Sequence, residues 1–175
     1  MRWTVHGERS LYESPWVSLH LVDVELPGGE RFEHHVVRLP GPAASVVMHD
    51  PMRGLLLLWR HRFITDTWGW EVPAGRVDPG ETPLDAAVRE GLEESGWTPG
   101  PLRLLGVWHP TNGLCDQAFH AFLAEGATHV GEPVDRHEAE RVAWVPVERV
   151  RGLIADGQVL DGFSLTSLLL ALQEL

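Results

Sequence analysis

The chain is organised around residues 75–97, GRVDPGETPLDAAVREGLEESGW. Thr82 is a favourable helix N-cap, and Pro83 follows at the first helical position, where its missing N–H is not needed. Gly96 suits the left-handed residue that lies just past a helix end. These signals predict a helix over residues 83–95.

The predicted helix places carboxylates beside an apolar stripe. On a helical wheel this stripe comprises Leu84, Ala87, Val88, Gly91 and Leu92. Glu90 and Glu94 lie four residues apart at its edge, where like charges repel each other unless a divalent cation lies between them. Mg²⁺ is held in proteins by one or two carboxylates together with waters and substrate phosphates, so the helix predicts a magnesium site. The alternative is that a Glu-rich helix is a solvated surface.

The charged positions follow the signature of a known family. The chain resembles the Nudix hydrolases, which cleave nucleoside diphosphates linked to another moiety, in the spacing of Gly75, Glu81, Arg89-Glu90, Glu93-Glu94 and Gly96. Gly91 departs from the pattern, because the family normally has an aliphatic residue there. A glycine in mid-helix costs up to about 1 kcal/mol relative to alanine, and we expect it to leave a small space under the helix.

Composition indicates a globular protein. A length of 175 residues suits one domain with a sizeable core, and 43% of the residues are hydrophobic. The single cysteine, Cys115, excludes an intrachain disulfide framework and fits a reducing compartment. The sequence shows no apolar signal segment and no apolar run long enough to span a membrane. We therefore expect a cytoplasmic protein with no membrane partner.

The charge balance limits the partners. A formal net charge of −11 opposes a general role in binding nucleic acid, whose affinity depends on Lys and Arg contacts to phosphate. A small phosphorylated substrate is still compatible, because metal ions and a few local arginines can set the field inside a site.

The N-terminal part of the chain predicts a β-hairpin. Residues 16–26 alternate apolar and polar side chains, and residues 31–39 return after a Pro-Gly-Gly turn. Residues 1–14 are polar and are expected to be irregular or an edge element. The predicted domains are an N-terminal hairpin, 1–40, and a catalytic domain, 41–175.

The second domain mixes short strands with few helices. Strands are expected over 43–49, 55–59, 68–72, 102–108, 117–123 and 141–145. Further helices are expected over 146–155 and 162–175, the last one amphipathic, with a polar connection over 125–140. The pattern predicts an α/β fold, an α/β/α sandwich with a mixed β-sheet. The Nudix resemblance implies the same architecture.

The sequence around the signature is similar to the ADP-ribose pyrophosphatase branch, the nucleoside diphosphate sugar hydrolases. Shared features are the run Glu71–Gly75, the upstream hairpin, the basic segment Arg60–Arg62, Pro110, and the pair Glu138 and Glu140. In this branch the N-terminal strands pack against a second subunit, so the resemblance implies a homodimer.

The resemblance implies a set of metal ligands. Glu90 and Glu94 would bind Mg²⁺, or Mn²⁺, together with the backbone carbonyl of Ala74. Glu93 would contribute to the catalytic metal cluster directly or through water, and Glu140 is a further candidate ligand.

Other residues receive roles on the same ground. Arg89 and Glu81 would hold the constellation in place, Arg62 would contact the diphosphate, and Arg38 would lie at the nucleotide end. Glu138 would be the general base. A base on a loop suits a step that begins after substrate has closed the site, but the spacing does not decide between Glu138 and Glu140. Both would be surface residues if the loop were only a solvated turn.

The sequence therefore predicts a Mg²⁺-dependent hydrolase that splits ADP-ribose or a related nucleoside diphosphate sugar into a nucleoside monophosphate and a sugar phosphate. Its partner is a nucleoside diphosphate-linked small molecule. One alternative is a hydrolase of nucleoside triphosphates or oxidised nucleotides. Another is a module that senses a nucleotide without cleaving it, which the presence of all the signature carboxylates disfavours.

Overall fold

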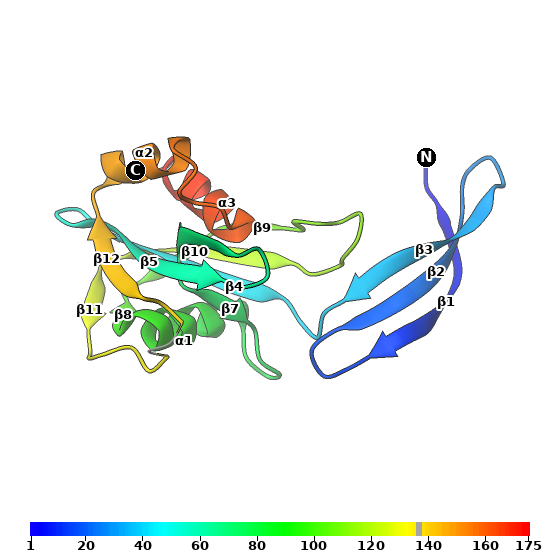
Figure 1. Cartoon of the computed structure of the whole chain (residues 1–175), viewed down its shortest axis with the longest axis horizontal. Coiled ribbons are helices and arrows are strands. Elements are labelled where there is room, and N and C mark those ends of the chain that lie inside the picture. Colours follow the sequence, from blue (N-terminus) through cyan, green and yellow to red (C-terminus); the bar gives the residue numbers. More distant parts are fainter. Residues whose placement is uncertain (136–137) are drawn as a thin grey trace. The chain divides into compact units, whose positions relative to one another are not determined.

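The computed structural model describes residues 1–135 and 138–175, and the chain forms two compact units (Figure 1). Unit 1 contains Met1–Pro42 and His109–Ala118, and unit 2 contains Ala43–Trp108 and Phe119–Leu175. The segment His109–Ala118 belongs to unit 1 because it contacts residues far from it in sequence. Local sequence patterns do not predict such contacts.

Unit 1 is a three-stranded antiparallel sheet. Its strands, in the order β1-β2-β3, are β1 (Thr4–Glu13), β2 (Ser18–Glu25) and β3 (Arg31–Arg38). The predicted hairpin is confirmed as β2 and β3, and the expected edge element is a full strand that is exposed along its length. Residues His109–Ala118 contact this sheet within unit 1, where the Val37 N–H donates to the Leu114 carbonyl at 2.8 Å.

Unit 2 contains the predicted mixed sheet. Its main path is β12-β5-β4-β10-β9, formed by β12 (Arg141–Val145), β5 (Gly54–Arg62), β4 (Ala43–Asp50), β10 (Phe119–Glu125) and β9 (Leu102–Trp108). Two further strands, β6 (Thr67–Glu71) and β7 (Ala74–Arg76), pair with β5 and β4. The sheet is mixed because β10 and β4 are parallel while the other pairs are antiparallel.

The predicted polar connection 125–140 contains a strand that sequence reasoning missed. This strand, β11 (Ala127–His129), pairs with β8 (Trp97–Pro99) directly after the first helix. Three-residue strands carry too short an alternation to be recognised from sequence.

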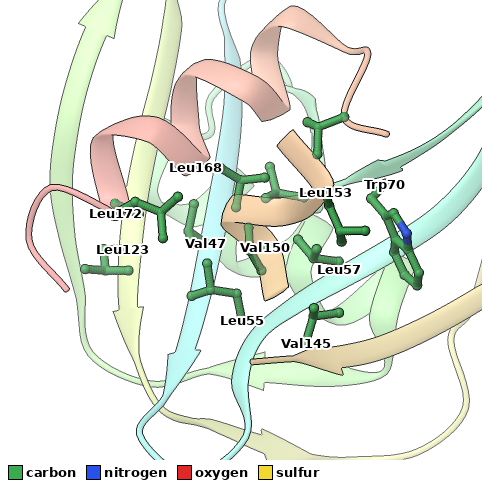
Figure 2. Packing of buried hydrophobic residues seen from close by; sticks show 13 residues of the cluster. Val47, Leu55, Leu57, Trp70, Leu123, Val145, Val150, Leu153, Leu168 and Leu172 are labelled. Atoms are coloured by element: carbon green, nitrogen blue, oxygen red, sulfur yellow. The ribbon is translucent and has the colours of Figure 1, made fainter. Parts of the chain in front are cut away.

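Helices cover both faces of the unit 2 sheet (Figure 1): α1 (Pro83–Ser95) lies on one side, and α2 (Val147–Ala155) and α3 (Gly162–Ala171) lie on the other. The central strands are apolar runs because successive side chains enter opposite cores. Leu56 and Leu58 belong to the core on the α1 side. Leu55 and Leu57 belong to the α2 and α3 side, shown in Figure 2. The predicted α/β/α sandwich is confirmed.

The last helix is shorter than predicted and is not amphipathic. It ends at Ala171 rather than at Leu175, and Leu169 is 46% exposed on its outer side. The buried side carries two hydroxyls, of which Ser167 bonds to Ser45 at 3.0 Å and Ser164 accepts from the Val72 N–H at 3.2 Å. Among the described residues, no helix has the length and apolar character needed to cross a membrane.

The first helix has the predicted limits and caps. Thr82 and Asp85 form a capping box, and Gly96 adopts the left-handed conformation with φ of 75°. The predicted buried stripe is partly wrong, because Leu84 is 42% exposed while Glu94 is buried within the contact face. Helix α1 therefore presents a carboxylate to the protein interior.

The expected space under Gly91 is absent. A Cβ atom at Gly91 would lie 2.9 Å from the Pro99 Cγ and 3.1 Å from a Val46 methyl group. The helix backbone thus packs directly on β4 and β8, which only a residue without a side chain allows. Gly91 is a close-contact position, and the packing around it has no void.

We predict that Gly91→Ala lowers the free energy of unfolding by about 1 kcal/mol, because overpacking of about 1–3 kcal/mol exceeds the gain in helix propensity. Gly152→Ala in α2 is the matched control, since a Cβ there meets no atom within 4 Å. This control should be neutral or stabilising by up to about 1 kcal/mol. Urea unfolding measures both variants, and a stabilised Gly91→Ala protein would contradict the packing.

Candidate active site

Glu94 is the most buried carboxylate of the signature, with 2% of its surface exposed. Its Oε1 accepts a hydrogen bond from Arg60 Nη2 at 2.8 Å, and its Oε2 accepts one from the Ala74 N–H at 2.9 Å. Burial raises the pKa of Glu94 to about 8, and the Arg60 guanidinium opposes that rise. The ionised form of Glu94 therefore needs more positive charge than Arg60 alone supplies.

Arg60 is a site residue that sequence reasoning did not select. It lies near the end of β5 with only 3% of its surface exposed, and it contacts carboxylates from three other segments. The sequence signal was present in the basic run Arg60–Phe63. Because alternate strand residues share a face, Arg60 and Arg62 point the same way.

Arg62, the predicted diphosphate contact, is half exposed and pairs with the buried carboxylate of Glu71. Its Nε donates to both Glu71 oxygens at 2.9 and 3.2 Å, and its Nη2 donates at 2.5 Å. This charge-assisted contact holds the pKa of Arg62 above its usual value. Arg62 is thus fixed on the same strand face as Arg60.

Arg89 organises the other three glutamates of the signature. Its guanidinium donates two hydrogen bonds to Glu81, both at 3.0 Å, one to Glu90 at 2.7 Å and one to Glu93 at 3.1 Å. A further bond to the Arg76 carbonyl, at 2.9 Å, ties it to β7. One arginine therefore fixes three carboxylates relative to one strand.

The pKa values of these carboxylates differ with their surroundings. The hydrogen bonds from Arg89 lower the pKa of Glu81, which lies near the surface. Burial raises the pKa of Glu90, and the neighbouring Arg89 opposes that rise. Glu90 and Glu94 are consequently the two carboxylates whose ionised forms are least well solvated.

Gly75 lies against the Glu90 carboxylate. A Cβ atom at this position would be 2.0 Å from Glu90 Oε1. Gly96 at the other end of the helix is similarly constrained, because a Cβ there would be 2.1 Å from the Gly131 carbonyl oxygen. Both signature glycines therefore permit close packing of the backbone. Gly75 packs against the Glu90 carboxylate, and Gly96 packs against the loop that contains Gly131.

The loop after β11 runs back along the end of α1. The Val130 N–H donates to the Gly96 carbonyl at 2.9 Å, and the Asp135 N–H donates to the Glu93 carbonyl at 3.2 Å. Residues 136 and 137 of the predicted polar connection lie outside the described residues. These two hydrogen bonds hold the loop against α1 just before the predicted loop carboxylates, Glu138 and Glu140.

Glu138 and Glu140 lie at different places on this loop. Glu138 Oε2 is 3.7 Å from Arg60 Nη1, which brings it next to the buried Glu94, and its side chain is 54% exposed. The exposed Glu140 lines a cavity of about 460 Å³ together with Glu94, Trp97 and Trp144. Both loop residues therefore reach the surroundings of Glu94.

The residues of α1 fit a hard divalent cation. Glu90 and Glu94 supply carboxylate oxygens, the donors that Mg²⁺ prefers, from partly or fully buried positions where a nearby positive charge is needed. Among residues 1–135 and 138–175, no group of three or more His, Cys, Asp or Glu side chains is arranged to hold a metal ion. Glu90 and Glu93 instead bond to Arg89, and Glu94 bonds to Arg60.

Two predicted site residues, Ala74 and Arg38, make contacts other than the predicted ones. Ala74 reaches Glu94 through its N–H, so ligation of a metal by the Ala74 carbonyl stays a prediction. Arg38 belongs to unit 1, where it pairs with Glu8 at 2.7 Å and Asp116 at 2.6 Å. Its role at the nucleotide end of a substrate likewise stays a prediction.

Comparison with known proteins covers nearly the whole chain. Residues 39–163 match the family profile described as NUDIX domain, and residues 3–37 match the one described as nucleoside diphosphate sugar hydrolase N-terminal domain. A solved structure titled "Crystal structure of ADP compounds hydrolase" superposes with a TM-score of 0.87 at 19% identity, covering 99% of this chain and 94% of that one. The superposition supports the fold.

The curated relatives fall into two groups by their sequence identity to this chain. The CMP-5'-(N-acetyl-N-hydroxy-3-aminopropyl)phosphonate hydrolase of Streptomyces rubellomurinus is 41% identical, over 98% of this chain and 83% of its own length. ADP-ribose pyrophosphatases of Bacillus subtilis and Mycobacterium tuberculosis are 28% and 27% identical, over 89% and 95% of this chain and 84% and 81% of their own lengths.

We predict that Gly75→Ala displaces the Glu90 carboxylate and weakens Mn²⁺ binding by about 10- to 100-fold, the usual effect of disturbing a ligand's support. The fold should persist, because the clash falls on the end of a side chain. Mn²⁺ titration followed by electron paramagnetic resonance measures the affinity, with Gly152→Ala as the control for the same chemical change. Unchanged Mn²⁺ affinity would remove Glu90 from the metal site.

We also predict that the metal-free protein loses stability as pH rises from 4.5 to about 8. In this range folded Glu94 keeps a proton that the unfolded chain releases, so the unfolded state binds fewer protons and stability falls with pH. The contribution is at most about 1.4 kcal/mol per pH unit. Urea midpoints in the presence of a chelator should fall less steeply for Glu94→Gln than for the wild type. Parallel profiles would show that Glu94 does not titrate in this range.

Proposed function

From the chain's membership of the Nudix hydrolase family, we infer that it is a divalent metal-dependent hydrolase of the diphosphate link in nucleoside diphosphate-type substrates. The observation that carries this proposal is the buried carboxylate Glu94, held by Arg60 and the Ala74 N–H beside Glu90. A cation bound next to this carboxylate would account for its burial. A helix with a purely structural role would carry an apolar residue at this position.

Glu90 and Glu94 would hold the metal, Mg²⁺ or Mn²⁺, with the Ala74 carbonyl. Glu93 would contribute directly or through water, and Glu140 is a further candidate ligand. When bound, such a metal neutralises phosphate oxygens and makes a bound water more acidic. Arg89 keeps Glu90 and Glu93 in fixed positions through the hydrogen bonds of its guanidinium.

Other residues would act on the substrate and the attacking water. Arg62 is exposed enough to contact a phosphate while Glu71 fixes its direction. Glu138 would accept the proton of the water, and its position beside Arg60 brings it close to the predicted metal ligands. Arg38 would contact the nucleotide end.

Two substrate classes follow from the relatives. The N-terminal profile and the ADP-ribose pyrophosphatases favour ADP-ribose or another nucleoside diphosphate sugar. The relative at 41% identity favours a CMP-linked phosphonate. Both substrate classes join a nucleoside monophosphate to a second anionic phosphorus centre, a phosphate in one class and a phosphonate in the other.

Hydrolysis of nucleoside triphosphates is the less favoured alternative. A putative 8-oxo-dGTP diphosphatase of Bacillus subtilis is 51% identical, but over only 61% of this chain. The N-terminal sheet, matched over residues 3–37, favours the diphosphate-sugar class. The carboxylates Glu81, Glu90, Glu93 and Glu94 are all present, which disfavours a sensor without activity.

A homodimer and a cytoplasmic location complete the proposal. Strand β1 is an edge strand of ten residues with exposed Val5 and Tyr12, and such an edge is available for pairing with a second chain. The single cysteine fits the reducing cytoplasm.

The test is release of nucleoside monophosphate, followed by chromatography, across ADP-ribose, nucleotide sugars, a CMP-linked phosphonate and nucleoside triphosphates. We expect metal-dependent turnover fastest on ADP-ribose, another diphosphate sugar or the CMP-linked phosphonate. Glu94→Gln should lower turnover by about 100-fold or more while leaving the fold intact. Turnover on triphosphates alone would move the protein to the rival class. Nucleotide binding without turnover would favour the sensor.

A further inference from the structure

Arg60 is placed between two parts of the site that are separate in sequence. It lies on β5, and its planar guanidinium faces Glu94 on α1 at 2.8 Å and Glu138 on the loop at 3.7 Å. Different nitrogens make the two contacts, Nη2 to Glu94 and Nη1 to Glu138. Because the guanidinium is rigid, its two terminal nitrogens attract the helix carboxylate and the loop carboxylate from fixed positions.

The neighbouring charges leave Arg60 available for this role. Glu71 lies 3.9 Å from Arg60 Nε, but its oxygens accept the three hydrogen bonds from Arg62. Arg60 is therefore the principal cation for Glu94, and the remaining side of its guanidinium is directed to Glu138. An arginine with 3% exposure is held in one place by packing, unlike a surface arginine.

The loop backbone is anchored at the same point of β5. The Glu140 N–H donates to the carbonyl of Trp59, the residue before Arg60, at 2.9 Å, and the Glu138 N–H donates to the Asp135 carbonyl at 3.1 Å. The loop thus has a main-chain contact and a side-chain contact with consecutive residues of one strand. The Glu140 bond continues the β12–β5 ladder, in which Arg141 pairs with Trp59, so the end of the loop is fixed next to Arg60.

We propose that Arg60 is a positioning residue that docks the loop carboxylate Glu138 beside the buried helix carboxylate Glu94. The consequence for catalysis rests on the proposed function, in which Glu138 is the base and Glu94 holds the metal. The docking itself does not depend on that function. A lysine in place of Arg60 keeps the charge next to Glu94 but has a single nitrogen, so it does not hold both carboxylates at their present separation.

The first arm of the test measures docking without metal or substrate. Hydrogen exchange of the Glu138 and Glu140 amides, followed by NMR, should be roughly 10-fold faster in Arg60→Lys than in the wild type. Arg62→Lys is the matched control, because Arg62 lies on the same strand face and bonds to Glu71. It should leave both amides unchanged. Equal exchange in Arg60→Lys and the wild type would overturn the docking.

The second arm measures the effect on the reaction. Arg60→Lys should lower kcat by about 10- to 100-fold while the affinity for Mn²⁺ alone and the KM change by less than about threefold. In a Glu138→Gln background most of this loss should disappear, since Arg60 acts through Glu138. The same fold-loss of kcat in both backgrounds would assign Arg60 a role that does not involve Glu138.

The two arms separate the inference from the proposed function. A wild-type protein inactive on every substrate would refute the proposed function, while the exchange of the two amides would still test the docking. If Arg60→Lys does not fold, the double variant R60Q/E94Q replaces the buried Arg60–Glu94 pair by two amides, and the same acceleration of amide exchange is expected. Unaltered exchange in that folded variant would overturn the inference.

Discussion

The buried contact of Glu94 with Arg60 and the Ala74 N–H is the constraint on which the catalytic unit depends. A carboxylate with 2% exposure requires donors that are already in place, and here they come from β5 and β7. The contact therefore fixes α1 relative to two strands at once. It also leaves a carboxyl with a raised pKa at the centre of the site, where an added cation would be stabilising.

Close approach of α1 to the sheet makes that contact possible. Gly91 places the helix backbone on Pro99 and Val46, and Gly75 allows the Glu90 carboxylate to lie against β7. A side chain at either position would separate the elements or displace the carboxylate. The two glycines thus allow the backbone segments to approach each other closely, and the two arginines, Arg60 and Arg89, hold the carboxylates in place.

The chain is acidic overall, and two of its arginines lie where several carboxylates meet. Arg89 faces three glutamates, and Arg60 faces carboxylates from three other segments. This arrangement holds a set of like charges together in a folded protein before any metal is bound.

The sequence by itself determined the limits of α1, its caps, the main strands of the sheet and the signature residues, because each of these depends on neighbours a few positions away. Thr82, Pro83 and Gly96 act through local hydrogen bonds and backbone angles, which the sequence states directly. Only the tertiary structure decided that Glu94 is buried, that Gly91 lies in close contact, and that Arg60 joins Glu94 to Glu138. These features depend on which residues distant in the chain meet, and no local period or spacing encodes that choice.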